Sequence, residues 1–129
     1  MEDRYRHHLD GAVTPSYVIA ILSLLAQTYL VNPAAMHCIS HYESGHDVTA
    51  INGRHVSNVQ WDRNTFEWIA GKALEDPFFP HREYLLAHFT PDDPLAAMIV
   101  FAWALAHGYE SHWQTYRLCN DIQPLRLAR

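Results

Sequence analysis

The sequence has few basic residues: nine Lys and Arg stand against 14 Asp and Glu, a formal net charge of −5. Proteins that bind bare nucleic acid normally present a basic surface that displaces phosphate counterions. The charge balance therefore argues against nucleic acid as a partner. Ten histidines add a dependence on pH, because protonation of all of them would change the net charge from −5 to +5. We expect attraction to an anionic surface to strengthen below about pH 6.

The sequence also lacks a hydrophobic run long enough to span a membrane. The one candidate, residues 18–31, is shorter than the roughly 20 residues that a spanning helix needs, and it contains Ser23, Gln27 and Thr28. No basic flank directly precedes it and no small-residue cleavage site follows it, as a signal peptide would require. We predict a buried helix, no stable membrane insertion and no signal peptide.

Cysteine is scarce, with only Cys38 and Cys119 in the chain. In an oxidising compartment they could join two helices, and closing so long a loop would contribute up to about 4 kcal/mol of stability. Because no export signal is visible, the sequence favours two buried free thiols, although the disulfide stays open.

The chain has neither internal repeats nor low-complexity tracts. With 129 residues, 49% of them hydrophobic, it suits one compact domain. We expect a single domain over residues 1–129, with a core at about 15–119, flexible ends and a monomeric state.

Proline marks three predicted helix starts, because proline fits the first helical position and a side-chain oxygen before it can cap the free amides. These pairs are Thr14-Pro15, Asn32-Pro33 and Asp93-Pro94. Apolar spacing and breakers extend the prediction to helices at about 15–30, 33–44, 62–76, 82–89, 94–107 and 109–118. The fifth is apolar nearly all round and should be the central buried helix, whereas the tail after Cys119 should be mobile.

Between the second and third helices the helical period is lost. Asn52-Gly53, between residues 49–51 and 54–56, is typical of a two-residue β-hairpin turn. We therefore predict a small β-ribbon directly after the second helix.

Glu43 is the strongest candidate for chemistry. On a helical wheel it lies at the edge of the apolar arc, one turn after Ile39 and two after Met36. A carboxyl group so placed loses water on one side, which disfavours its charged form and suits a general acid for glycosidic bonds. The alternative is an acid at a helix end that simply points to solvent.

Several stretches resemble a known family. Residues 25–33 read Leu-Ala-Gln-Thr-Tyr-Leu-Val-Asn-Pro, residues 43–45 read Glu-Ser-Gly, and Ala50, Val59-Gln60 and Thr65 follow. In order and spacing they look like the soluble lytic transglycosylases and the related resuscitation-promoting factors, which have a lysozyme-like fold. Residues 93–108, with Trp113 and Cys119, look like the family's closing helices. The resemblance spans about residues 15–119, and its specific parts are Glu-Ser-Gly and Val-Gln-Trp.

The resemblance implies an α+β, mostly helical, lysozyme-like domain with a small β-hairpin beside the active-site cleft. Its substrate would be peptidoglycan, cleaved at the β-1,4 bond between N-acetylmuramic acid and N-acetylglucosamine. Glu43 would act first as acid and then as base, so that the muramyl 6-hydroxyl closes a 1,6-anhydro ring. No cofactor and no metal are implied.

The resemblance also suggests substrate-binding residues. Ser57, Asn58 and Gln60 would hydrogen-bond acetamido and hydroxyl groups, and Trp61 would offer a sugar ring an apolar face or else pack in the core. Asn58 stands where the family usually has glycine, and asparagine tolerates a left-handed backbone. Tyr109 is the candidate for the tyrosine that many of these enzymes set near the acid.

A hydrolysing muramidase of the same fold, as in a phage endolysin, is the first alternative. It would normally need a second acid to guide water, for which Asp47 and Asp62 are the nearest candidates. Asp62 is also explained as a helix cap and Asp47 as a turn residue, so the mechanism with one acid is preferred. An enzyme with either mechanism would act at the bacterial cell wall, as a released phage lysin, as part of a virion or after export.

A zinc site is the second alternative. His37 and His41 lie four apart on one helical face, with Glu43 and His46 close in sequence. Glu43 points to a different arc, and His37 lacks the neighbouring Glu of a metalloprotease helix, so an exposed histidine pair is favoured. A noncatalytic or DNA-binding helical domain fits the helix count but not the charge.

Overall fold

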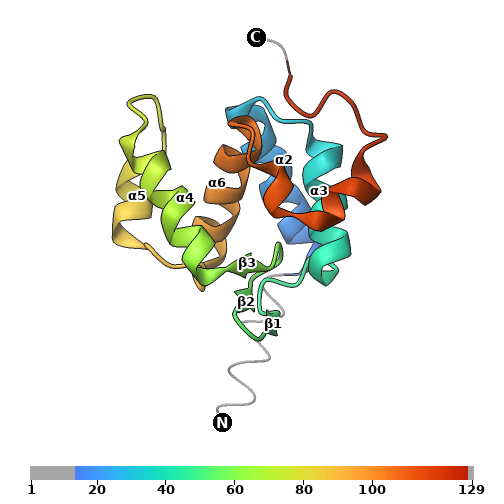
Figure 1. Cartoon of the computed structure of the whole chain (residues 1–129), viewed down its shortest axis with the longest axis horizontal. Coiled ribbons are helices and arrows are strands. Elements are labelled where there is room, and N and C mark those ends of the chain that lie inside the picture. The colour runs from blue at the N-terminus through green and yellow to red at the C-terminus, as the bar shows by residue number, and fades with distance from the viewer. Residues whose placement is uncertain (1–13, 128–129) are drawn as a thin grey trace.

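The computed structural model describes residues 14–127, and Figure 1 shows a mostly helical arrangement with one small antiparallel sheet. The elements are α2 (Pro15–Tyr29), α3 (Pro33–Ser44), β1 (Ile51–Asn52), β2 (His55–Val56), β3 (Trp61–Asp62), α4 (Arg63–Glu75), α5 (Arg82–Ala87), α6 (Pro94–Ala106) and the 3-10 helices η1 (Glu110–His112) and η2 (Gln114–Cys119). The predicted α+β, mostly helical class is confirmed. The ends expected to be flexible, 1–13 and 128–129, lie outside the described residues. No described helix is both long and apolar enough to cross a membrane.

Side-chain caps begin the main helices where the sequence predicts them. Four side-chain oxygens accept an N–H of the first turn: Thr14 for α2, Asn32 for α3, Asp62 for α4 and Asp93 for α6. Helix α3 ends at Gly45, whose φ of 66° is the left-handed conformation that stops a helix. Helix α2 ends just before Leu30, which is also left-handed, and α5 is shorter than predicted.

Helix α6 is the centre of the core, as predicted. Every residue from Ala96 to Leu105 is buried, so the helix has no solvent face. Figure 1 shows α6 between α4 on one side and α2 on the other, and both helices pack against it. The sheet lies at one end of this helical group, next to the C-terminal end of α3.

The predicted β-ribbon is present, but its turn is shifted by one residue. Asn52 pairs with His55, so Gly53 and Arg54 form the turn instead of Asn52 and Gly53. Gly53 has a φ of 63°, which glycine adopts without strain. The ribbon also has a third strand that the sequence did not predict, because β3 pairs antiparallel with β2 immediately before α4.

The predicted helix at 109–118 is wrong. The segment forms two 3-10 helices, η1 and η2, separated by Trp113 in an extended conformation. The indole of Trp113 is buried and donates to the carbonyl of Val59, and its ring packs edge-on against Trp61 and Phe101. The burial of Trp113 requires an extended backbone at this residue, and this interrupts the predicted helix.

The tail after Cys119, expected to be mobile, makes specific contacts over the described residues. Arg126 pairs with Val31 as an antiparallel β-bridge, and Leu125 is buried. The Arg126 guanidinium donates to the carbonyl of Leu105 and to both oxygens of Glu110. The tail therefore closes over the junction between α2 and α3.

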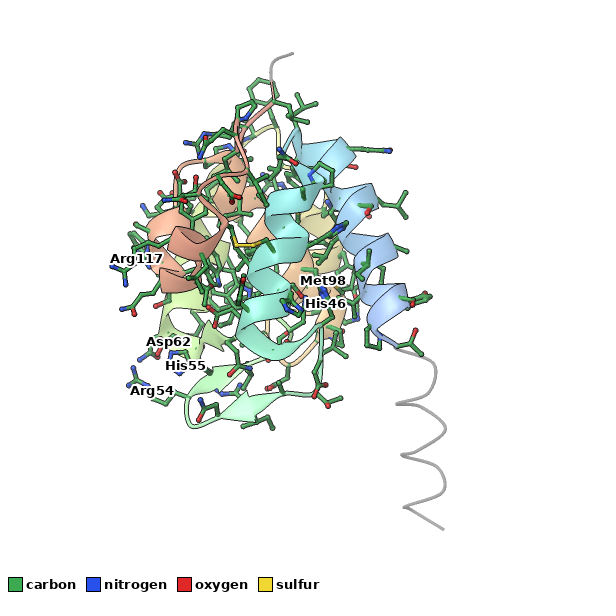
Figure 2. All side chains as sticks on the ribbon, turned by 90° about the vertical axis from the view of Figure 1, so that its right-hand side faces the viewer. His46, Arg54, His55, Asp62, Met98 and Arg117 are labelled. Atoms are coloured by element: carbon green, nitrogen blue, oxygen red, sulfur yellow. A yellow bond between two sulfur atoms is a disulfide. The ribbon has the colours of Figure 1, made fainter. Side chains whose placement is uncertain are left out.

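Cys38 and Cys119 form a disulfide, which corrects the expectation of free thiols. The bond joins α3 to η2 and is the yellow link in Figure 2. The expectation of free thiols rested on the absence of a visible export signal. That absence says nothing about whether the two cysteines meet in the fold. Helix α3 also packs extensively against η2.

We predict that the double substitution Cys38→Ala and Cys119→Ala lowers the free energy of unfolding by about 4 kcal/mol, because the disulfide closes a loop with a separation of 81 residues. Urea denaturation measures the change. Dithiothreitol should lower the midpoint of the wild-type protein and leave that of the double variant unchanged. A wild-type midpoint that does not respond to reductant would contradict the role given to the disulfide.

Candidate functional site

Glu43 lies in the last turn of α3, where the helix meets the ribbon, and its side chain is half-buried. Its Oε2 accepts a hydrogen bond of 2.5 Å from the Oγ1 of Thr115, which belongs to η2. The two residues are 72 positions apart. The packing of η2 on α3 therefore determines how the carboxyl group is oriented.

The other carboxyl oxygen, Oε1, has no hydrogen-bond partner among the described residues. Within residues 14–127 no buried side-chain oxygen or nitrogen lacks a partner. The unpartnered Oε1 is therefore not fully buried. Glu43 thus has one oxygen fixed by Thr115 and one without a partner, which is compatible with proton transfer.

Ser44 fastens the end of α3 to the ribbon. Its Oγ donates to the carbonyl of Asn58 at 2.7 Å and accepts from the N–H of Asp47 at 3.0 Å. These contacts hold the turn after Gly45 in place. The Glu-Ser-Gly sequence therefore combines a candidate acid, a structural tie and a helix stop.

Ser57 and Asn58, expected to bind substrate, are buried instead. Asn58 is 0% exposed; its Nδ2 donates to Ser40 and its Oδ1 accepts from the hydroxyl of Ser57. The side chains support the turn from inside. The left-handed residues of this turn are Ser57 and Gln60, with φ of 77° and 52°, so the backbone freedom expected of Asn58 is not what the turn uses.

Gln60 and Trp61 also stabilise this region from within. The Gln60 amide donates to the carbonyls of Ala50 and Ser57. Trp61 is 1% exposed and donates to the carbonyl of Ala97, so packing in the core, and not a sugar platform, is the correct alternative. Among the residues considered so far, Glu43 has a fixed carboxyl oxygen and a side chain that is only half-buried.

Tyr109 lies with a different aromatic group. Its ring stacks near Trp103 and meets Trp68 and His112, with ring centres about 6 Å apart. Among the described residues, no hydrogen bond joins it to Glu43. The structure therefore does not bring Tyr109 to the candidate acid.

The two candidates for a second acid have local roles. Asp62 caps α4 and pairs with Arg54 at 2.8 Å. The hydrogen bond from the N–H of Thr65, and to a smaller extent the contact with Arg54, holds the pKa of the Asp62 carboxyl below its usual value. Asp47 accepts from both the N–H and the hydroxyl of Thr49. Both carboxylates are explained by the turn and helix that contain them.

The histidines near Glu43 are tied to hydroxyl groups. His37 lies 3.0 Å from the Oγ of Ser23, and buried His46 lies 2.8 Å from the Oγ of Ser40. Within residues 14–127 no group of three or more His, Cys, Asp or Glu is arranged to hold a metal ion. The residues named for a zinc site are therefore not arranged to hold a metal ion.

Sequence reasoning missed Thr115 and the buried network of Ser40 and His46. Thr115 is found only through the contact of η2 with α3, and no local pattern marks it. His46 has a φ of 64° after Gly45 and turns its ring back toward Ser40, a placement that helical spacing cannot predict.

Comparison with protein-family models, with curated proteins and with solved structures finds no match to the chain.

We predict that the protein becomes less stable as the pH falls below about 6.5, the ordinary pKa of histidine. Burial lowers the pKa of His46, His37 and His81 in the folded state, and nearby His37 and His41 lower that of His46 further. The unfolded chain therefore takes up protons first, and stability is lost with acidification. Because these three histidines take up protons only at lower pH, the net charge near pH 6 is less positive than protonation of all ten histidines would make it.

Urea denaturation between pH 7.5 and 5.5 measures this dependence. His46→Gln should make stability depend less on pH than in the wild-type protein, whereas His55→Gln, at an exposed position, should not. Equal pH slopes for wild type and His46→Gln would show that His46 does not contribute.

Proposed function

We propose that the protein is a peptidoglycan-cleaving enzyme of the lytic transglycosylase type with a lysozyme-like fold. It breaks the β-1,4 bond between N-acetylmuramic acid and N-acetylglucosamine. The observation that carries the proposal is the carboxyl group of Glu43, with Oε2 held by Thr115 and Oε1 unpartnered and not fully buried. Its partner is the glycan strands of the bacterial cell wall, and it acts on them as a monomer.

The arrangement around Glu43 supports this proposal. A helix that ends in Glu-Ser-Gly is followed by an antiparallel ribbon, and Ser44 ties the two together. This order agrees with the family that the sequence resembles. Glu43 is also half-buried, so a sugar seated there would remove more of its water and strengthen its interactions with the reacting atoms.

The reaction needs only one carboxyl group. Glu43 donates its proton through Oε1 to the glycosidic oxygen as the bond from the muramyl C1 to that oxygen breaks. The acetamido group of the substrate stabilises the positive charge on C1. Glu43 then accepts the proton of the muramyl 6-hydroxyl while the oxygen of that hydroxyl bonds to C1. The acid is thereby regenerated and no water is consumed.

The local roles of Asp47 and Asp62 favour this route over hydrolysis. Water attack would normally be guided by a second carboxylate, and both nearby candidates are engaged in capping or turn contacts. A hydrolysing muramidase remains the alternative reaction for the same carboxyl group. The two differ in product, since transglycosylation leaves 1,6-anhydro ends and hydrolysis leaves reducing ends.

We predict that Glu43→Gln lowers cleavage of purified peptidoglycan by at least about 100-fold, because the amide cannot supply a proton. The fold should stay intact, since an amide fits the same space. Mass spectrometry of the soluble products measures the loss and identifies the ends. Glu75→Gln is the matched control, an exposed acid at the end of α4 that should retain full activity.

Four outcomes separate the possibilities. Anhydro ends from the wild-type protein support transglycosylation, and reducing ends support the muramidase. Full activity of Glu43→Gln, or no release by the wild-type protein, contradicts the proposal.

We predict that Thr115→Val lowers kcat by roughly tenfold or more, with a smaller change in KM, because Oε2 loses the hydroxyl that orients the carboxyl group. Thr115→Ser keeps a hydroxyl and should restore most of the rate. Steady-state kinetics on soluble glycan fragments measure both. If Val and Ser variants are equally active, Thr115 does not position Glu43.

A further inference from the structure

A pocket of about 440 Å³ opens on the segment that holds Thr115. All of its lining comes from η1, η2 and the residue between them: Glu110, Ser111, Trp113, Gln114, Tyr116 and Arg117. Trp113 is buried and Tyr116 is half-buried, so both give the pocket an aromatic floor, while Gln114 and Arg117 are exposed at its edge. An aromatic floor with a few polar groups is the usual composition of a small ligand site.

The pocket carries a positive charge, although the chain as a whole has a formal charge of −5. Glu110 is balanced by Arg126, which contacts it at 2.9 and 3.3 Å and, by hydrogen bonding, holds the pKa of the Glu110 carboxyl below its usual value. Within residues 14–127, Arg117 forms no ion pair and donates no hydrogen bond. Its guanidinium is therefore available to a ligand, and a carboxylate matches the planar fork of its N–H groups.

The pocket is built on the same 3-10 helix that contacts Glu43. Thr115, which binds Glu43, stands between Gln114 and Tyr116. In a 3-10 helix three residues make a turn, so Gln114 and Arg117 share one side and Thr115 occupies the next. Figure 2 shows Arg117 on the same side of the molecule as Arg54, His55 and Asp62 of the ribbon. The pocket and the residue that orients Glu43 therefore belong to one short segment, on neighbouring sides of it.

We propose that this pocket binds a short acidic peptide, with its carboxylate on the Arg117 guanidinium. Its link to the substrate rests on the proposed function, since the peptide attached to N-acetylmuramic acid carries free carboxylates. Gln114 can donate to a peptide carbonyl, and Trp113 and Tyr116 pack against the peptide backbone. The protein then distinguishes glycan strands that carry peptides from strands that lack them.

The test measures binding of N-acetylmuramyl-L-alanyl-D-glutamate, which has no bond between two sugars and so cannot be cleaved by the proposed reaction. Titration followed by NMR should show binding that weakens with salt, because the guanidinium is exposed. Arg117→Gln should weaken it roughly tenfold, as should conversion of the carboxylates of the probe to methyl esters. Arg63→Gln is the control, since it removes one surface charge paired with Asp92 outside the pocket and should bind as the wild type does.

Equal binding by Arg117→Gln, equal binding of the ester, or no binding at about 10 mM probe would overturn the proposal. Its failure is distinguishable from that of the proposed function, because binding of the probe requires no cleavage. If the probe binds through Arg117 but peptidoglycan is not cleaved, the pocket stands and the enzyme assignment fails. If peptidoglycan is cleaved but the probe does not bind, the reverse holds.

Discussion

The region around Glu43 depends on one buried amide, the side chain of Asn58. Its nitrogen donates to Ser40 in α3, its oxygen accepts from Ser57, and its backbone carbonyl accepts from Ser44. A buried amide without partners costs about 1–3 kcal/mol, so these contacts strongly favour one arrangement of the turn against the helix. The direction of the last turn of α3, and with it that of Glu43, follows from this constraint.

The second constraint comes from the C-terminal part of the chain. Trp113 enters the core beside Trp61, the disulfide ties Cys119 to α3, and between them η2 offers the hydroxyl of Thr115 to Glu43. The ribbon side and the η2 side of the site are thus set by different segments. Glu43 lies where they meet, which explains why one carboxyl oxygen is fixed and the other is left open.

Local signals in the sequence predicted the fold well, and contacts between distant segments escaped them. Proline with a capping side chain, and glycine after α3, determine their helix ends by short-range sterics and hydrogen bonds. The 3-10 segments, the disulfide and the burial of Asn58 depend instead on which surfaces meet. Glu43 could be named as a candidate because its own helix marks it. Thr115 and Arg117 were not, because their meaning comes only from the position of η2.

The β-bridge between Val31 and Arg126 has a consequence for the order in which the chain acquires its shape. During synthesis, Glu43 leaves the ribosome long before its hydrogen-bond partner Thr115. Arg126, which closes the corner beside α2, emerges later still. Helices α2 and α3 can therefore form early as a hairpin without the clamp that orients Glu43. That carboxyl group gains its orientation only in the last stage of biosynthesis, after the segment beyond α6 has docked.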